Sequence, residues 1–135
     1  METYRELNQT YRYEGLVNYI SDRYSSAVEI GIGHFSDVAF ALLKKGMQIF
    51  ATDVLPFKYN GLRVIADDIM EPDLTVYTDI DLLYSLRPPP ELIYYMVKLT
   101  RRLKADLIVK PLSPDYFEGK LLRHGNTTFF LWSFL

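Results

Sequence analysis

The chain has 135 residues, of which 49% are hydrophobic and 24% charged, and this balance favours a folded domain over a disordered chain. The formal net charge of −2 gives no indication of nucleic-acid binding. The absence of cysteine excludes disulfides, thiolate metal sites and cysteine nucleophiles, and with two histidines no metal site is predicted. No segment resembles a signal peptide or a membrane span, so we expect a cytoplasmic protein.

The first half of the chain alternates helices with strands. Apolar residues recur at helical spacing from Tyr13 to Tyr24, and residues 1–24 are interpreted as an N-terminal helical segment. A strand over 27–30 leads into a tight turn at 31–34. A second helix is predicted from about Ser36 to Lys45, with Gly46 suited to its C-terminal end. Strands are predicted over 47–52 and 62–66.

The second half continues the alternation and then changes character. A strand over 81–85 precedes three prolines and a helix that has Pro90 in its first turn, followed by a strand over 106–110. Residues 120–122 and 127–134 are typical of a hairpin joined by His124-Gly125-Asn126. The order predicts an α/β fold with a mostly parallel sheet and a C-terminal antiparallel hairpin. We expect a single domain over 1–135, with a Rossmann-like core over 27–135.

The turn Gly31-Ile32-Gly33 is the strongest functional signal, because it joins a strand to a helix. Glycines allow a sharp turn and close approach of a ligand, and N–H groups at the helix start attract polar or anionic groups. Asp53 ends the next strand, where dinucleotide-binding and S-adenosylmethionine-binding folds place an acid on the ribose hydroxyls. A turn without a ligand and a solvated loop aspartate are the plainer alternatives.

Further candidates follow the third and fourth strands. Asp67 or Asp68 could accept a hydrogen bond from an adenine amino group, and Ile69 could pack on the ring; the alternative is a helix-capping or turn acid pair. Ser85 could line the same crevice. Arg87 follows a central strand and Lys110 ends the fifth, where ligands bind in open α/β sheets. They are candidate substrate or catalytic residues; the alternatives are a surface ion pair for Arg87 and a solvated strand end for Lys110.

The stretch from Glu29 to Asp53 resembles motif I and the following acid of class I S-adenosylmethionine-dependent methyltransferases. An acid two residues before the first glycine is typical of that family, whereas nicotinamide-binding domains usually have an apolar residue there. The block 81–92 is similar to one in a family of small uncharacterised archaeal proteins with this fold. The resemblance implies a three-layer Rossmann-like methyltransferase fold with strand order 3-2-1-4-5-7-6. It also implies S-adenosylmethionine as cofactor, held by Glu29, Gly31, Gly33, Asp53, Asp67, Asp68, Ile69 and Ser85.

Three features depart from the methyltransferase pattern. Phe35 stands where many members have a third glycine, and Leu86-Arg87-Pro88-Pro89 replaces the Asn/Asp-Pro-Pro-aromatic signature of amino methyltransferases. The strand that ends at Lys110 resembles that of 2′-O-ribose RNA methyltransferases, but their aspartate after the fourth strand is missing.

Three functions therefore stay open. They are an S-adenosylmethionine-binding protein with possible methyl transfer, a non-catalytic Rossmann-fold binding or regulatory module, and, third, an NAD-binding domain. A protein partner or a homo-oligomer is left open. Four cations on the helix after the prolines are interpreted as a solvated face rather than an RNA-facing patch; they are Lys98, Arg101, Arg102 and Lys104.

Overall fold

A computed structural model describes residues 12–113 and 118–135 of the chain. Its seven strands form one sheet in the order β3-β2-β1-β4-β5-β7-β6, which is the order that the methyltransferase resemblance implied. The first five strands are parallel, and the last two add an antiparallel hairpin. Their bounds are β1 Ser26–Ile30, β2 Gln48–Asp53, β3 Val64–Ala66, β4 Leu82–Leu86, β5 Asp106–Lys110, β6 Lys120–His124 and β7 Thr127–Ser133.

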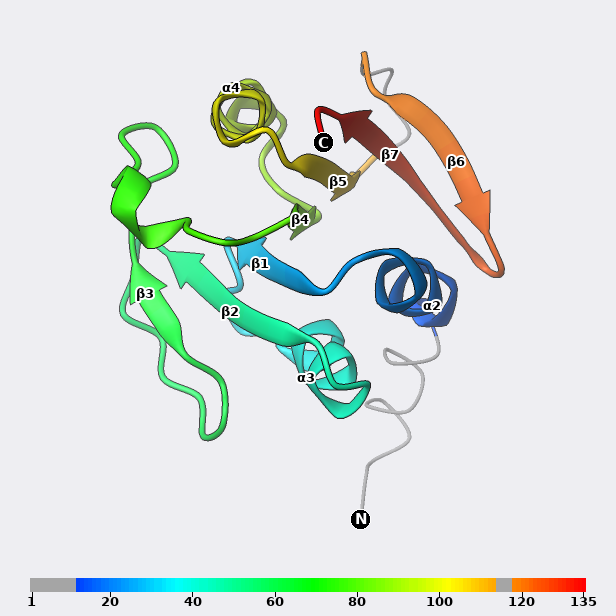
Figure 1. Cartoon of the computed structure of the whole chain (residues 1–135), viewed down its shortest axis with the longest axis horizontal. Coiled ribbons are helices and arrows are strands. Elements are labelled where there is room, and N and C mark those ends of the chain that lie inside the picture. Colours follow the sequence, from blue (N-terminus) through cyan, green and yellow to red (C-terminus); the bar gives the residue numbers. More distant parts are fainter. Residues whose placement is uncertain (1–11, 114–117) are drawn as a thin grey trace.

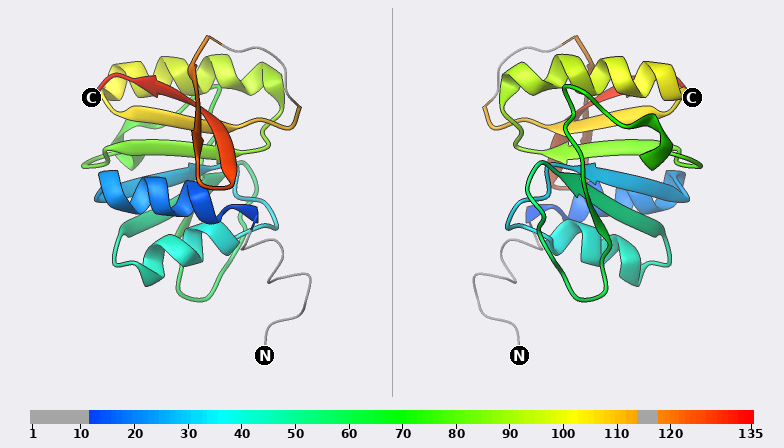
Figure 2. Two further views of the ribbon diagram at one scale, coloured as in Figure 1. Left: turned by 90° about the vertical axis from the view of Figure 1, so that its right-hand side faces the viewer. Right: turned by 90° about the vertical axis from the view of Figure 1, so that its left-hand side faces the viewer.

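Helices cover both faces of the sheet and make the fold three-layered (Figures 1 and 2). Helices α2 (Glu14–Arg23) and α3 (Asp37–Lys44) pack on one face, and α4 (Ile93–Leu103) packs on the other. The described residues also form two short 3-10 helices, η1 (Leu74–Val76) and η2 (Pro90–Leu92). Because both faces are covered, the central strands β1, β4 and β5 are almost entirely buried. Within the described residues, no helix is long and apolar enough to cross a membrane.

The elements predicted from the sequence are present, with shifts at their ends. The strand expected over 62–66 begins only at Val64, because Leu62 is in an isolated bridge with Tyr59 instead. The first hairpin strand extends to His124, which leaves a two-residue turn. Ser36 stands at the N-cap of α3 without a side-chain capping bond. Residues 1–11 of the expected N-terminal helical segment lie outside the described residues.

The hairpin turn caps helix α2, although the two segments are far apart in the sequence. The amide of Gly15 donates to Asn126 Oδ1 at 2.8 Å, so one of the unpaired N–H groups at the start of α2 is satisfied. Gly15 also allows this contact sterically, because a Cβ there would lie 1.9 Å from the carbonyl oxygen of His124. Figure 2 shows the turn of the hairpin beside the beginning of α2.

A buried acid lies at the centre of the sheet. Glu29 on β1 is 1% exposed and is the register partner of Tyr84 on β4. The Tyr84 hydroxyl donates to Glu29 Oε1 at 2.8 Å. Burial raises the pKa of Glu29 to about 8, although the hydrogen bond from Tyr84 lowers it. At neutral pH the carboxyl group is therefore mainly protonated.

We expect Gly15→Ala to lower the free energy of unfolding by about 1–3 kcal/mol, because the new methyl group meets backbone atoms of the hairpin that have little freedom to move. Chemical denaturation followed by circular dichroism measures this. Asp22→Ala, at an exposed position of the same helix, is the matched control and should change stability little. Equal stability of the two variants would contradict the close packing of α2 on the hairpin.

The pKa of Glu29 makes stability depend on pH. Between the ordinary value of 4.5 and about 8, the folded protein holds a proton that the unfolded chain has released, so stability falls as pH rises through this range. We expect the free energy of unfolding to fall by at most about 1.4 kcal/mol per pH unit relative to Glu29→Gln, which keeps a neutral side chain. Glu91→Gln, which alters an exposed acid, should follow the wild type. Parallel pH profiles for wild type and Glu29→Gln would show that Glu29 is ionised when buried.

Candidate functional site

The glycine turn lies where the carboxyl ends of β1, β2 and β4 meet. Gly31 and Gly33 have φ angles of 72° and 53°, a conformation that other residues adopt only with strain. A Cβ built at either glycine would meet no atom within 4 Å. The two positions therefore need glycine for conformation, and open space lies beside the turn where a ligand can approach.

The amide hydrogens of this turn are already bonded within the protein. The amides of Gly31 and Ile32 donate to the carbonyl oxygen of Thr52 at 2.9 and 3.3 Å. The amide of Gly33 donates to Asp53 Oδ2 at 2.9 Å. The sequence analysis expects the N–H groups at the start of the following helix, which begins at Asp37, to attract a polar or anionic group. The three amides of the glycine turn itself are instead bonded to the end of β2.

One side of the turn opens into a pocket of about 250 Å³, here named the acidic pocket. Asp53 and Asp67 line it, and a carboxylate can accept more hydrogen bonds than either makes. Asp53 accepts from the amides of Gly33 and Leu55, and Asp67 accepts from the amide of Asp73 and the hydroxyl of Tyr77. The apolar part of the lining of the acidic pocket includes Ile30, Ile69, Leu92 and Met96.

Two other residues that the sequence suggested for cofactor binding, Ser85 and Asp68, differ in whether they line the acidic pocket. Ser85 lines the acidic pocket but donates its hydroxyl to the carbonyl oxygen of Ile30 at 2.8 Å, which ties β4 to β1. Asp68 is exposed, does not line this pocket, and caps the amide of Met70 at 2.9 Å. Of the acid pair, Asp67 is thus the member beside the glycine turn.

A central pocket of about 340 Å³ continues the crevice past the turn. It shares Gly31, Leu86 and Arg87 with the acidic pocket, and Glu29 lies at its wall. A basic pocket of about 440 Å³ follows, lined by Arg87 and Lys110 among others. The structure thus brings Arg87 and Lys110 together, and the amide of Arg87 donates to the carbonyl oxygen of Lys110 at 2.6 Å. Burial lowers the pKa of Lys110.

Several residues of the crevice were not among the sequence candidates for the site. Arg12 and Tyr13 precede α2 and line the central and basic pockets, while Thr52 lines the acidic pocket. Phe35, which replaces the third glycine, lines the central pocket and packs on Tyr13 with ring centroids 5.5 Å apart. Thr52 could have been found from its position before Asp53, and Phe35 from its position two residues after Gly33. Arg12 and Tyr13 could not, because they reach the crevice through the packing of a distant segment.

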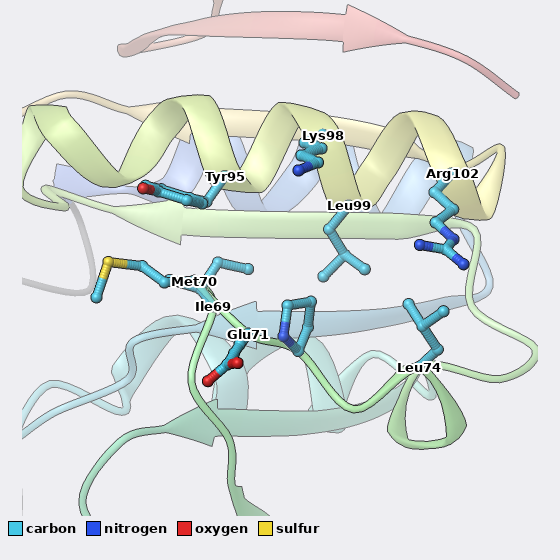
Figure 3. Close-up of a pocket in the computed structure, with 9 residues that line it drawn as sticks. Ile69, Met70, Glu71, Leu74, Tyr95, Lys98, Leu99 and Arg102 are labelled. Carbon is cyan, nitrogen blue, oxygen red and sulfur yellow. The ribbon is translucent and has the colours of Figure 1, made fainter.

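A separate pocket of about 430 Å³ lies between α4 and the segment after β3 (Figure 3). Tyr95, Leu99 and Arg102 point from α4 toward the segment that carries Met70 and Leu74. Of the cofactor candidates it contains only Ile69. All four cations that the sequence assigned to a solvated helix face are exposed, and Lys98 and Arg102 line this pocket.

Solved structures with a similar fold include S-adenosylmethionine-dependent methyltransferases. The "SAM dependent methyltransferase" of Archaeoglobus fulgidus aligns with a TM-score of 0.61 at 14% identity, over 77% of this chain and 52% of that protein. This chain therefore spans about half of its length. The RNA methyltransferase of Salinibacter ruber, solved in complex with S-adenosyl-L-homocysteine, aligns with a TM-score of 0.59 at 9% identity, over 99% and 93% of the two chains. These likenesses establish the methyltransferase-like fold.

Curated relatives by sequence are archaeal proteins of uncharacterised function. The UPF0146 protein of Archaeoglobus fulgidus is 40% identical over 118 residues, which cover 86% of this chain and 91% of that protein. The UPF0146 protein of Pyrococcus horikoshii is 32% identical over 117 residues, which cover 82% and 89%. The family profile matches residues 14–133, and the chain therefore belongs to the uncharacterised protein family UPF0146.

Proposed function

We propose that the chain binds S-adenosylmethionine along the crevice at the carboxyl ends of its strands. The ribose hydroxyls would donate to Asp53, the adenine would lie between Ile69 and Met96 with its amino group toward Asp67, and the methionine part would enter the central pocket beside Glu29. These residues line two connected pockets that share Gly31. The Salinibacter ruber protein, which matches over 93% of its own chain, holds S-adenosylhomocysteine, so a fold of this size is large enough.

The main observation behind the proposal is that the amides of the glycine turn donate hydrogen bonds to residues at the end of β2. A dinucleotide places its pyrophosphate on free N–H groups at a glycine turn. Here the amides of Gly31, Ile32 and Gly33 are bonded to Thr52 and Asp53, and the acidic pocket offers carboxylates instead. Carboxylates suit a ligand that brings donors and positive charge. Hydroxyls, an amino group and a sulfonium ion meet that description, and a pyrophosphate does not.

When bound, S-adenosylmethionine would supply a methyl group to a nucleophile: the carbon–sulfur bond breaks as the new bond to the acceptor forms, and the electron pair returns to sulfur. The residues of this chain would then act by positioning. Glu29, neutral in the empty protein, would become ionised more easily beside the positive charges of the ligand. The acceptor would lie beside Lys110 at the far end of the crevice and beside Arg87, which borders all three pockets.

Calorimetric titration with S-adenosylhomocysteine and with NAD tests the proposal. We expect saturable binding of S-adenosylhomocysteine and no binding of NAD at the same concentrations, because the amides of Gly31, Ile32 and Gly33 are already bonded within the protein. Binding of NAD alone, or of NAD more tightly, would overturn the proposal.

Asp53 also needs a test that separates its two roles, since it holds Gly33 in the fold. We expect the wild type to prefer S-adenosylhomocysteine over its 2′-deoxyribose analogue by roughly ten-fold, because the analogue lacks one hydrogen bond to a charged acceptor. In Asp53→Asn this preference should shrink to about three-fold or less, even if both affinities fall. Asp22→Asn, on an exposed part of α2, is the control and should keep the full preference. An unchanged preference in Asp53→Asn would show that Asp53 does not contact the ribose.

A further inference from the structure

The basic pocket has a charge opposite to that of the acidic pocket at the other end of the crevice. Its cations come from three separate parts of the chain: Arg12 before α2, Arg87 after β4 and Lys110 at the end of β5. No carboxylate lines it among the described residues. A chain with a net charge of −2 thus gathers three positive side chains around one cavity of about 440 Å³, which is a suitable size for a small molecule.

The backbone of Arg87 is held in an unusual conformation. Its φ angle is 54°, in the left-handed region that costs a non-glycine residue conformational energy. The hydrogen bond from its amide to Lys110 and the following Pro88–Pro90 hold it there. Such conformations concentrate at ligand sites, where the surrounding structure stabilises them. This one places an arginine where the acidic, central and basic pockets meet.

The rest of the basic pocket is largely apolar. Leu112, Leu121 and Phe130 line it, and Leu121 is 62% exposed. Thr128 Oγ1 lies 3.3 Å from Lys110 Nζ and steadies that side chain. Apolar surface next to cations suits a ligand that joins an anionic group to an apolar or aromatic body. An arginine fork binds carboxylate and phosphate oxygens in pairs, whereas a lysine acts as a point charge.

We propose that the basic pocket binds a small organic anion, a carboxylate or phosphate attached to an apolar group, and that this anion is the methyl acceptor of the crevice. The role of the anion as methyl acceptor rests on the proposed function, whereas the anion site itself does not. A cationic amine is disfavoured at the same place, because Arg12, Arg87 and Lys110 would repel it.

The test is a titration of the ¹⁵N-labelled 135-residue chain, without cofactor, followed by NMR. The probes are benzoate, phenyl phosphate, benzyl alcohol and benzylamine, which share one ring and differ in charge. We expect saturable shifts at the amides of Arg87, Lys110 and Leu121 with one or both anions. The amine should bind at least ten-fold more weakly than the preferred anion. Whichever of benzoate and phenyl phosphate binds more tightly shows whether the pocket prefers a carboxylate or a phosphate.

Three variants locate the site. Lys110→Met and Arg87→Lys should each lower the affinity for the anion at least five-fold. Arg87→Lys keeps the charge but loses the paired N–H donors of the guanidinium group. Lys44→Met, at an exposed position of α3, is the control and should leave the affinity unchanged. If Arg87→Lys fails to fold, Lys110→Met alone decides. Equal binding of benzylamine and benzoate, or equal weakening by Lys110→Met and Lys44→Met, would overturn the proposal.

Titration with S-adenosylhomocysteine separates this proposal from the previous one. If the anion binds at the basic pocket and S-adenosylhomocysteine does not bind, the anion site is supported and the proposed function fails. If S-adenosylhomocysteine binds and neither anion does, the proposed acceptor class is wrong while the cofactor site is supported.

Discussion

The crevice depends on one contact, the hydrogen bonding of the glycine turn to the end of β2. Two turn amides donate hydrogen bonds to the carbonyl oxygen of Thr52 and a third donates to the Asp53 carboxylate, so the turn is fixed to the neighbouring strand. This contact sets the shape of the turn and uses the donors with which a turn of this kind would hold a phosphate. It also gives Asp53 two roles, because the carboxylate that builds the turn also faces the acidic pocket. Under the proposed function, Asp53 would therefore serve both the fold and ligand recognition.

Charge changes sign along the crevice. Asp53 and Asp67 line one end, Lys110 lines the other, and Arg87 lies between them. Near the middle is Glu29, whose raised pKa keeps it mainly neutral at neutral pH in the empty protein. A long ligand, or a pair of ligands, with donors and positive charge at one end and negative charge at the other would match this gradient. Arg87 is the residue through which the two ends would influence each other electrostatically.

The sequence predicts elements better than contacts. The strand over 106–110 and the left-handed Gly46 follow from local patterns of hydrophobicity and turn chemistry, and both are in the structure. The meeting of the glycine turn with Asp53 was also predictable, since the carboxyl ends of parallel strands share one edge of a sheet. The bond between Gly33 and Asp53 was not, because it depends on the distance between two loops. The position of Arg12 at the crevice was not predictable either, since α2 must first pack on the sheet.

The cap that the hairpin turn provides for α2 has a consequence for the order of folding. Gly15 and Asn126 are 111 residues apart in sequence, so this bond belongs to the contacts that slow folding most. During synthesis from the N-terminus, α2 leaves the ribosome long before its partner does. The hairpin has to pack on α2 and pair with the open edge of β5, and both contacts need residues near the C-terminal end. The parallel strands pair without those residues, so the contact between Gly15 and Asn126 can form only after the rest of the sheet has been synthesised.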